Sequence, residues 1–184
     1  MSCLTKIQSA IPYTCDGGNT GILSALLINK EDIASITFSS ANASRVTGLT
    51  LKKGASAYKV DTVKRTLVTT EALKVNEGAP NAFTHTVTIT ATSASPRDLI
   101  NPVANSSLVV ITKTLHSVGS TIAGDEARPF GLYYGMSATG VDRSSHDNGA
   151  WYTITLATPE RVIGEDSLLM DIELYDALYA RAIG

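Results

Sequence analysis

The chain has 184 residues, of which 43% are hydrophobic and 17% are charged, and its net charge is −2. This length favours one domain with a real core, and the composition excludes a disordered chain. The negative net charge argues against a general phosphate-binding surface, and no apolar run is long enough for a transmembrane helix. The first residues lack a secretory signal, so we expect a protein kept in the cytosol until it is used.

Two cysteines, Cys3 and Cys15, lie near the N-terminus. Without an export signal we expect two free thiols, although a disulfide between them stays open. No histidine clusters with them, so they do not form a zinc site. We expect no cofactor.

The N-terminal third predicts short strands separated by polar segments. A glycine-rich loop, CDGGNTG, precedes an apolar run of strand length at residues 22–28, and a second strand follows at 33–38. The Ser-, Ala- and Gly-rich stretch from Ser39 to Ala57 is too long for an ordinary connection. We interpret it as a contact arm, in which Val46–Leu51 is one strand of a hairpin that turns at Gly54.

The centre of the chain predicts a hairpin with two chemically different faces. A β-branched segment ends near Val75, a turn occupies residues 76–81, and a strictly alternating strand follows, AFTHTVTIT. A period of two places Phe83, His85, Val87 and Ile89 on one face and Thr84, Thr86, Thr88 and Thr90 on the other. The second face is a row of uncharged hydroxyls.

The remaining elements are a helix and several strands. Ser95-Pro96 favours a short helix that ends near Asn101-Pro102, because the residue before proline disfavours helix. We expect strands at residues 108–115, 130–139 (bent by glycines) and 151–157. The last segment fits both a strand and a helical stripe. We favour a strand to about Tyr175 and a short helical or irregular end.

These elements sum to seven to nine strands and one short flanking helix, an all-β sandwich or barrel. We expect a single domain over residues 1–184, with the contact arm at about 39–57 and a C-terminal extension at about 160–184.

No group of residues has the pattern of an active site. His85, His116 and His146 are far apart in the sequence, and we interpret His85 as a core histidine satisfied by one hydrogen bond. The polar run DRSSHDNG has the composition of an exposed hairpin loop, and its spacing does not fit a calcium site. We expect no metal site and no enzyme activity.

Four blocks in a fixed order resemble a known family. They are CDGGNTGILSALLINKEDIASITF, TTEALKVNEGAPNAFTHTVTIT, SSLVVITKTL and FGLYYGMSATGVDRSSHDNGAWYTITLATPE. Together they resemble the tail tube proteins of tailed bacteriophages, particularly phages whose hosts are Bacteroidetes. The resemblance covers about residues 15–160, and the tail after Pro159 is longer than the family pattern.

The resemblance implies a structural protein of the virion. Its subunits would form rings, in that family hexameric, which stack into a tube and meet other phage tail proteins, and the genome would pass through in transient, non-specific contact. Assembly would take place in the host cytoplasm. Carried onto this chain, the candidates for the channel wall are Thr84, Thr86, Thr88 and Thr90. The candidates for contacts between rings are Arg45, Lys52 and Lys53.

Two other functions stay open. The first is another virion β-domain, such as a short-tail ring, a connector or a capsid decoration protein. The second is a carbohydrate-binding or adhesion module that uses the aromatic residues Tyr133, Tyr134 and Trp151.

Overall fold

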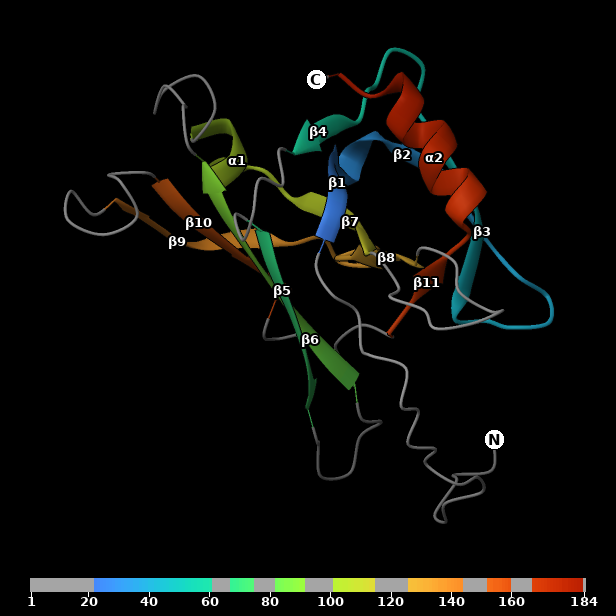
Figure 1. The fold of residues 1–184 in the computed structure, drawn as a ribbon, viewed down its shortest axis with the longest axis horizontal. Coiled ribbons are helices and arrows are strands. Elements are labelled where there is room, and N and C mark those ends of the chain that lie inside the picture. Colours follow the sequence, from blue (N-terminus) through green and yellow to red (C-terminus); the bar gives the residue numbers. More distant parts are fainter. Residues whose placement is uncertain are drawn as a thin grey trace.

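The computed structural model describes residues 22–60, 67–74, 82–91, 101–114, 126–143, 152–159 and 167–183, and these form two β-sheets and two short α-helices (Figure 1). Cys3 and Cys15 lie outside this part of the chain. The strands of the larger sheet are β1 (Ile22–Asn29), β2 (Ile33–Phe38), β3 (Arg45–Leu51), β4 (Tyr58–Val60), β7 (Leu108–Thr114), β8 (Glu126–Phe130) and β11 (Leu169–Met170).

The smaller sheet contains β5 (Leu67–Lys74), β6 (Ala82–Ala91), β9 (Ser137–Arg143) and β10 (Tyr152–Ala157). A one-turn 3-10 helix, Lys30–Asp32, joins β1 to β2, and the α-helices are α1 (Asn101–Asn105) and α2 (Ile172–Arg181). The strand order is β2-β3-β11-β8-β7-β1-β4 in the seven-stranded sheet and β5-β6-β10-β9 in the four-stranded sheet. The expected all-β class is confirmed. Within the described ranges neither sheet is closed on itself, and these ranges hold two short α-helices where one was expected for the chain.

Two hydrophobic cores make the fold three layers deep. One core lies between the two sheets and includes Val87, Val110 and Leu156. The other lies on the opposite face of the seven-stranded sheet, where α2 covers it, and includes Leu26, Ile111 and Tyr175. The centre of the seven-stranded sheet, where β1 and β7 contribute to both cores, is therefore buried on both faces. This explains why β7 reads as an unbroken apolar run, with buried residues from Leu108 to Thr112.

The C-terminal segment belongs to this core, and the expectation of a strand to Tyr175 is wrong. Strand β11 stops at Met170, and α2 begins at Ile172. Tyr175 is fully buried, and its hydroxyl lies 2.8 Å from the Ser24 hydroxyl. Burial raises the pKa of Tyr175 far above its ordinary value, so the hydroxyl stays protonated. The part of the expected extension that the structure describes, residues 167–183, is thus a structural layer.

The expectation of a hairpin around Gly54 is also wrong, because the strands before and after Gly54 do not pair with each other. Gly54 does lie in a turn with a φ of +84°. However, β3 pairs antiparallel with β2 on one side and parallel with β11 on the other, and β4 pairs with β1. The Ser39–Ala57 segment therefore contributes a strand with buried residues Val46 and Leu49 to the large sheet.

Two local predictions fail for reasons of backbone geometry. Asn101 and Pro102 lie in α1, which continues to Asn105, so the helix does not end at Asn101-Pro102 as expected; residues 92–100 lie outside the described part. The expected strand at 130–139 is interrupted by a turn between Gly131 and Gly135, both at φ +75°. A side chain at Gly131 would lie 2.5 Å from the Met136 side chain, so only glycine fits. This turn takes the chain from β8 in one sheet to β9 in the other.

Candidate channel surface and contact residues

The alternation predicted for β6 is confirmed, and its two faces meet different surroundings. His85, Val87 and Ile89 are buried against the larger sheet. The threonines at 84, 86, 88 and 90 are half-buried on the outer face of the smaller sheet, the face that points away from the larger sheet and from α2.

The outer face carries threonines on neighbouring strands in direct register. Thr88 lies opposite Thr155 of β10, and Thr90 lies opposite Thr153. On the other side of β6, Thr86 lies opposite Thr70 of β5. The threonine rows of β6 and β10 lie side by side on the outer face. They are one continuous surface, which we call the hydroxyl face (Thr70, Thr84, Thr86, Thr88, Thr90, Thr153 and Thr155).

The hydroxyl face has little capacity for chemistry or for strong binding. Among the outward positions whose side chains the structure describes, Asp142 of β9, opposite Thr153, is the only charged residue. The Thr84 hydroxyl donates a hydrogen bond to the Ala72 carbonyl at 3.2 Å. Neutral hydroxyls of this kind hydrogen-bond locally and offer no fixed cation to a phosphate.

A polar cluster lies between the sheets at one end of β6. His85 is 1% exposed, and its Nε2 lies 3.4 Å from Glu71 Oε2, which is 3.9 Å from Arg128 Nη1. The His85 ring meets the Phe130 ring edge-on, with centroids 5.2 Å apart. The His85 backbone N–H donates to the Thr158 hydroxyl. The histidine is thus a core residue, as its position in the alternation predicted. His116 and His146 lie outside the described residues.

No group of three or more metal-ligating side chains occurs within the described ranges.

The three candidate contact cations occupy different places. Arg45 is at the start of β3, where its Nε lies 2.5 Å from Asp171 Oδ1, the residue that precedes α2. Lys52 and Lys53 follow the other end of β3 and are exposed. Lys52 and Lys53 therefore lie together, at the opposite end of β3 from Arg45. Arg45 instead connects the start of α2 to β3 within the chain.

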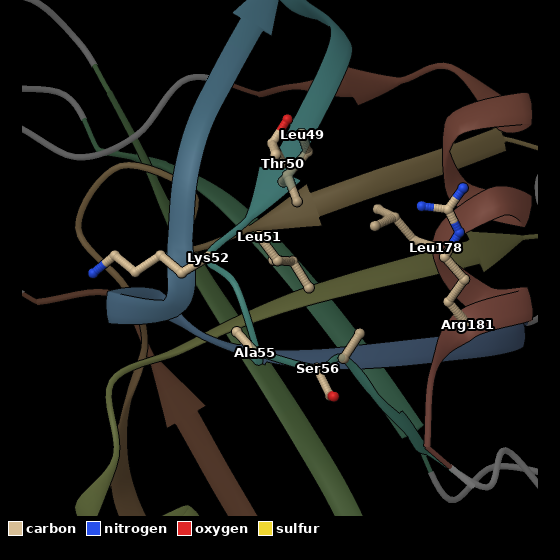
Figure 2. Close-up of a pocket in the computed structure, with 9 residues that line it drawn as sticks. Leu49, Thr50, Leu51, Lys52, Ala55, Ser56, Leu178 and Arg181 are labelled. Atoms are coloured by element: carbon tan, nitrogen blue, oxygen red, sulfur yellow. The ribbon is translucent and has the colours of Figure 1, made fainter.

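Sequence reasoning missed a pocket beside Lys52. It has a volume of about 310 Å³ and lies between the end of β3, the turn after it and the last turns of α2. Figure 2 shows Leu178 and Arg181 of α2 on one side, facing Leu51 and Ser56 on the other, with the Lys52 side chain pointing away. The pocket escaped prediction because a strand was expected up to about Tyr175, followed by a short helical or irregular end, whereas α2 is one helix from Ile172 to Arg181.

The exposed aromatic residues form a stack at the glycine-bracketed turn. The Tyr133 ring stacks on Phe38 with centroids 5.9 Å apart, and Tyr134 tilts against Tyr133 at 6.4 Å. Tyr152 is on the inner face of β10, packed against the core between the sheets. Trp151 lies outside the described residues.

None of the helices in the described ranges is both long and apolar enough to cross a membrane. No family model, curated protein or solved structure matches this chain. The resemblance to tail tube proteins therefore stays a prediction from sequence motifs.

Proposed function

We propose that this chain is a structural subunit of a phage tail tube, with the hydroxyl face lining the channel. The observation that carries the proposal is the hydroxyl face itself, on which threonines of three neighbouring strands lie in register, beside the exposed Val68 opposite Thr88. DNA slides through a channel only if the wall does not hold its phosphates, and a neutral or acidic wall meets that requirement.

The edges of the smaller sheet support ring formation. Among the described residues, β5 pairs only with β6, and β9 pairs only with β10, so each outer strand has one open side. Open edges invite pairing with other chains. Pairing of β5 in one copy with β9 in the next is a heterologous contact, which closes into a ring when the rotation between copies allows it.

Negative-stain microscopy of the purified, overexpressed chain tests the proposal directly. We expect rings and stacked tubes with a central channel. Single rings that never stack would favour a short-tail ring or connector. A chain that stays monomeric at high concentration would exclude both and leave an adhesion module, which binding to a glycan array would then support.

Charge reversal at the turn after β3 should separate ring formation from stacking. Lys52 and Lys53 are exposed, and within the described ranges neither is in an ion pair. We expect Lys52→Glu with Lys53→Glu to leave folding and rings intact and to reduce tube length several-fold, because opposite charges at a contact become like charges. Tube lengths in micrographs and the thermal midpoint measure the two effects, and tubes of normal length would remove these lysines from the contact.

Lysines introduced on the hydroxyl face should make the wall of the proposed channel bind DNA. The variant Thr86→Lys with Thr153→Lys adds two charges per subunit to that face. We expect assembled tubes of this variant to bind short duplex DNA at low salt and to release it as salt rises.

The matched control adds the same charges to exposed positions of α2, as Ala177→Lys with Ala180→Lys. DNA on the outside is open to nuclease, whereas DNA in a channel is protected. Equal digestion in both variants would show that the hydroxyl face does not line the channel.

A further inference from the structure

The pocket beside α2 has an apolar floor and a cationic mouth. Leu49, Leu51, Ala57 and Leu178 supply the apolar lining. Arg181, in the last turn of α2, is exposed, and within the described ranges it is in no ion pair. No carboxylate lines the pocket. This combination suits a ligand that carries a negative charge next to a small apolar group.

The size of the pocket restricts the ligand further. Its volume of about 310 Å³ is at the lower end of ligand-binding sites, which range from about 300 to 1,000 Å³. This volume suits one or two side chains of a peptide turn. Figure 2 shows the Arg181 side chain beside Leu178 at one wall, so a carboxylate bound there would have its apolar neighbours over Leu178 and Leu51.

The chain itself contains a segment of this chemistry. Residues 75–81 read VNEGAPN, with one acid, Glu77, no cation, and the small apolar pair Ala79-Pro80. The ends of β5 and β6 that this segment joins lie at the bottom of Figure 1, whereas the pocket beside α2 and the turn before β4 lies at the top. Copies that stack head to tail bring such opposite ends together.

We infer that the pocket receives residues 75–81 of a second copy of this chain, with the Glu77 carboxylate on the Arg181 guanidinium. The inference rests on the proposed function, since stacked rings supply the head-to-tail neighbour. Arg181 is then the residue that selects the partner segment, and Leu49, Leu51 and Leu178 hold its apolar part.

A charge swap tests the pairing. Arg181→Glu and Glu77→Arg should each leave single rings and reduce the amount of tube by about tenfold, the effect of losing one ion pair of about 1.4 kcal/mol. The double variant should restore tubes, because the pair is re-formed with its charges exchanged. Electron microscopy and sedimentation give the ring and tube fractions, and thermal unfolding verifies that each variant is folded.

The matched control is Glu165→Arg, which makes the same change in another acidic segment and should leave tubes unaltered. Normal tubes from Arg181→Glu would overturn the inference and leave the tail tube proposal standing. So would a folded double variant without tubes, or normal tubes from Glu77→Arg. A wild-type chain that forms no rings would overturn both proposals together.

Discussion

Replacement of Tyr175 by alanine should cost about 3–5 kcal/mol of the free energy of unfolding, the range for removing a large buried aromatic side chain. Tyr175 is 0% exposed and packs in the core between α2 and the seven-stranded sheet. Its ring stacks on Tyr179 with centroids 5.8 Å apart. Since a domain of this size is stabilised by about 5–15 kcal/mol in total, this loss is a large fraction of its stability. Equilibrium unfolding in urea, followed by circular dichroism, measures the loss.

Two further variants separate packing from hydrogen bonding at this position. Tyr175→Phe keeps the ring and removes only the hydroxyl contact with Ser24, so it should cost about 1 kcal/mol. Tyr179→Ala removes a half-buried ring from the same helix and should lie between the two. If Tyr175→Ala is no less stable than Tyr175→Phe, then α2 does not contribute to the core.

Proline at the position of β5 whose N–H points to the open side should abolish the proposed ring formation and leave the chain folded. Along an edge strand, alternate residues direct their backbone N–H towards the neighbouring strand and towards the open side. Of Thr69 and Thr70, one therefore donates to β6 and the other points to the open edge. Proline has no N–H to donate, and it is tolerated in a sheet at the outward-facing position.

Comparison of Thr69→Pro with Thr70→Pro turns this alternation into an internal control. The variant that keeps the wild-type thermal midpoint is the one altered at the open side, and we expect it to sediment as a monomer at concentrations where the wild type forms rings. The other variant should lose stability because a β5–β6 bond is lost. Rings from the stable variant would exclude β5 as the ring contact.

The strands were predictable where a short stretch of sequence fits the period of a strand and no other period. The alternation from Phe83 to Thr90 and the apolar run of β7 each determine a strand and its buried faces without reference to the rest of the chain. The hydroxyl face was half predictable. Its β6 row follows from the pattern, whereas its union with Thr153 and Thr155 depends on the pairing of β6 with β10 across more than sixty residues.

The C-terminal helix was not predictable with the same certainty because its sequence satisfies two periods. Met170, Ile172 and Leu174 alternate as in a strand, whereas Leu168, Ile172, Tyr175 and Tyr179 form a helical stripe. Tertiary packing decides between them. The Leu169 N–H donates to the Ser44 carbonyl just before β3, and the Asp171 N–H donates to the Val46 carbonyl in β3. Tyr175 then enters the core as part of α2. The pocket depends on this outcome and could not be found without it.

The position of β11 has a consequence for the order of events on the ribosome. Among the described strands of the large sheet, the β2–β3 hairpin is joined to the others only through Leu169–Met170. A nascent chain can therefore pair β1 with β7 and β7 with β8 before β11 is made, whereas the earlier β2–β3 hairpin must wait until Leu169–Met170 has been translated. Such a long sequence separation slows folding. Newly made chains thus complete the large sheet only after Leu169–Met170 has been translated.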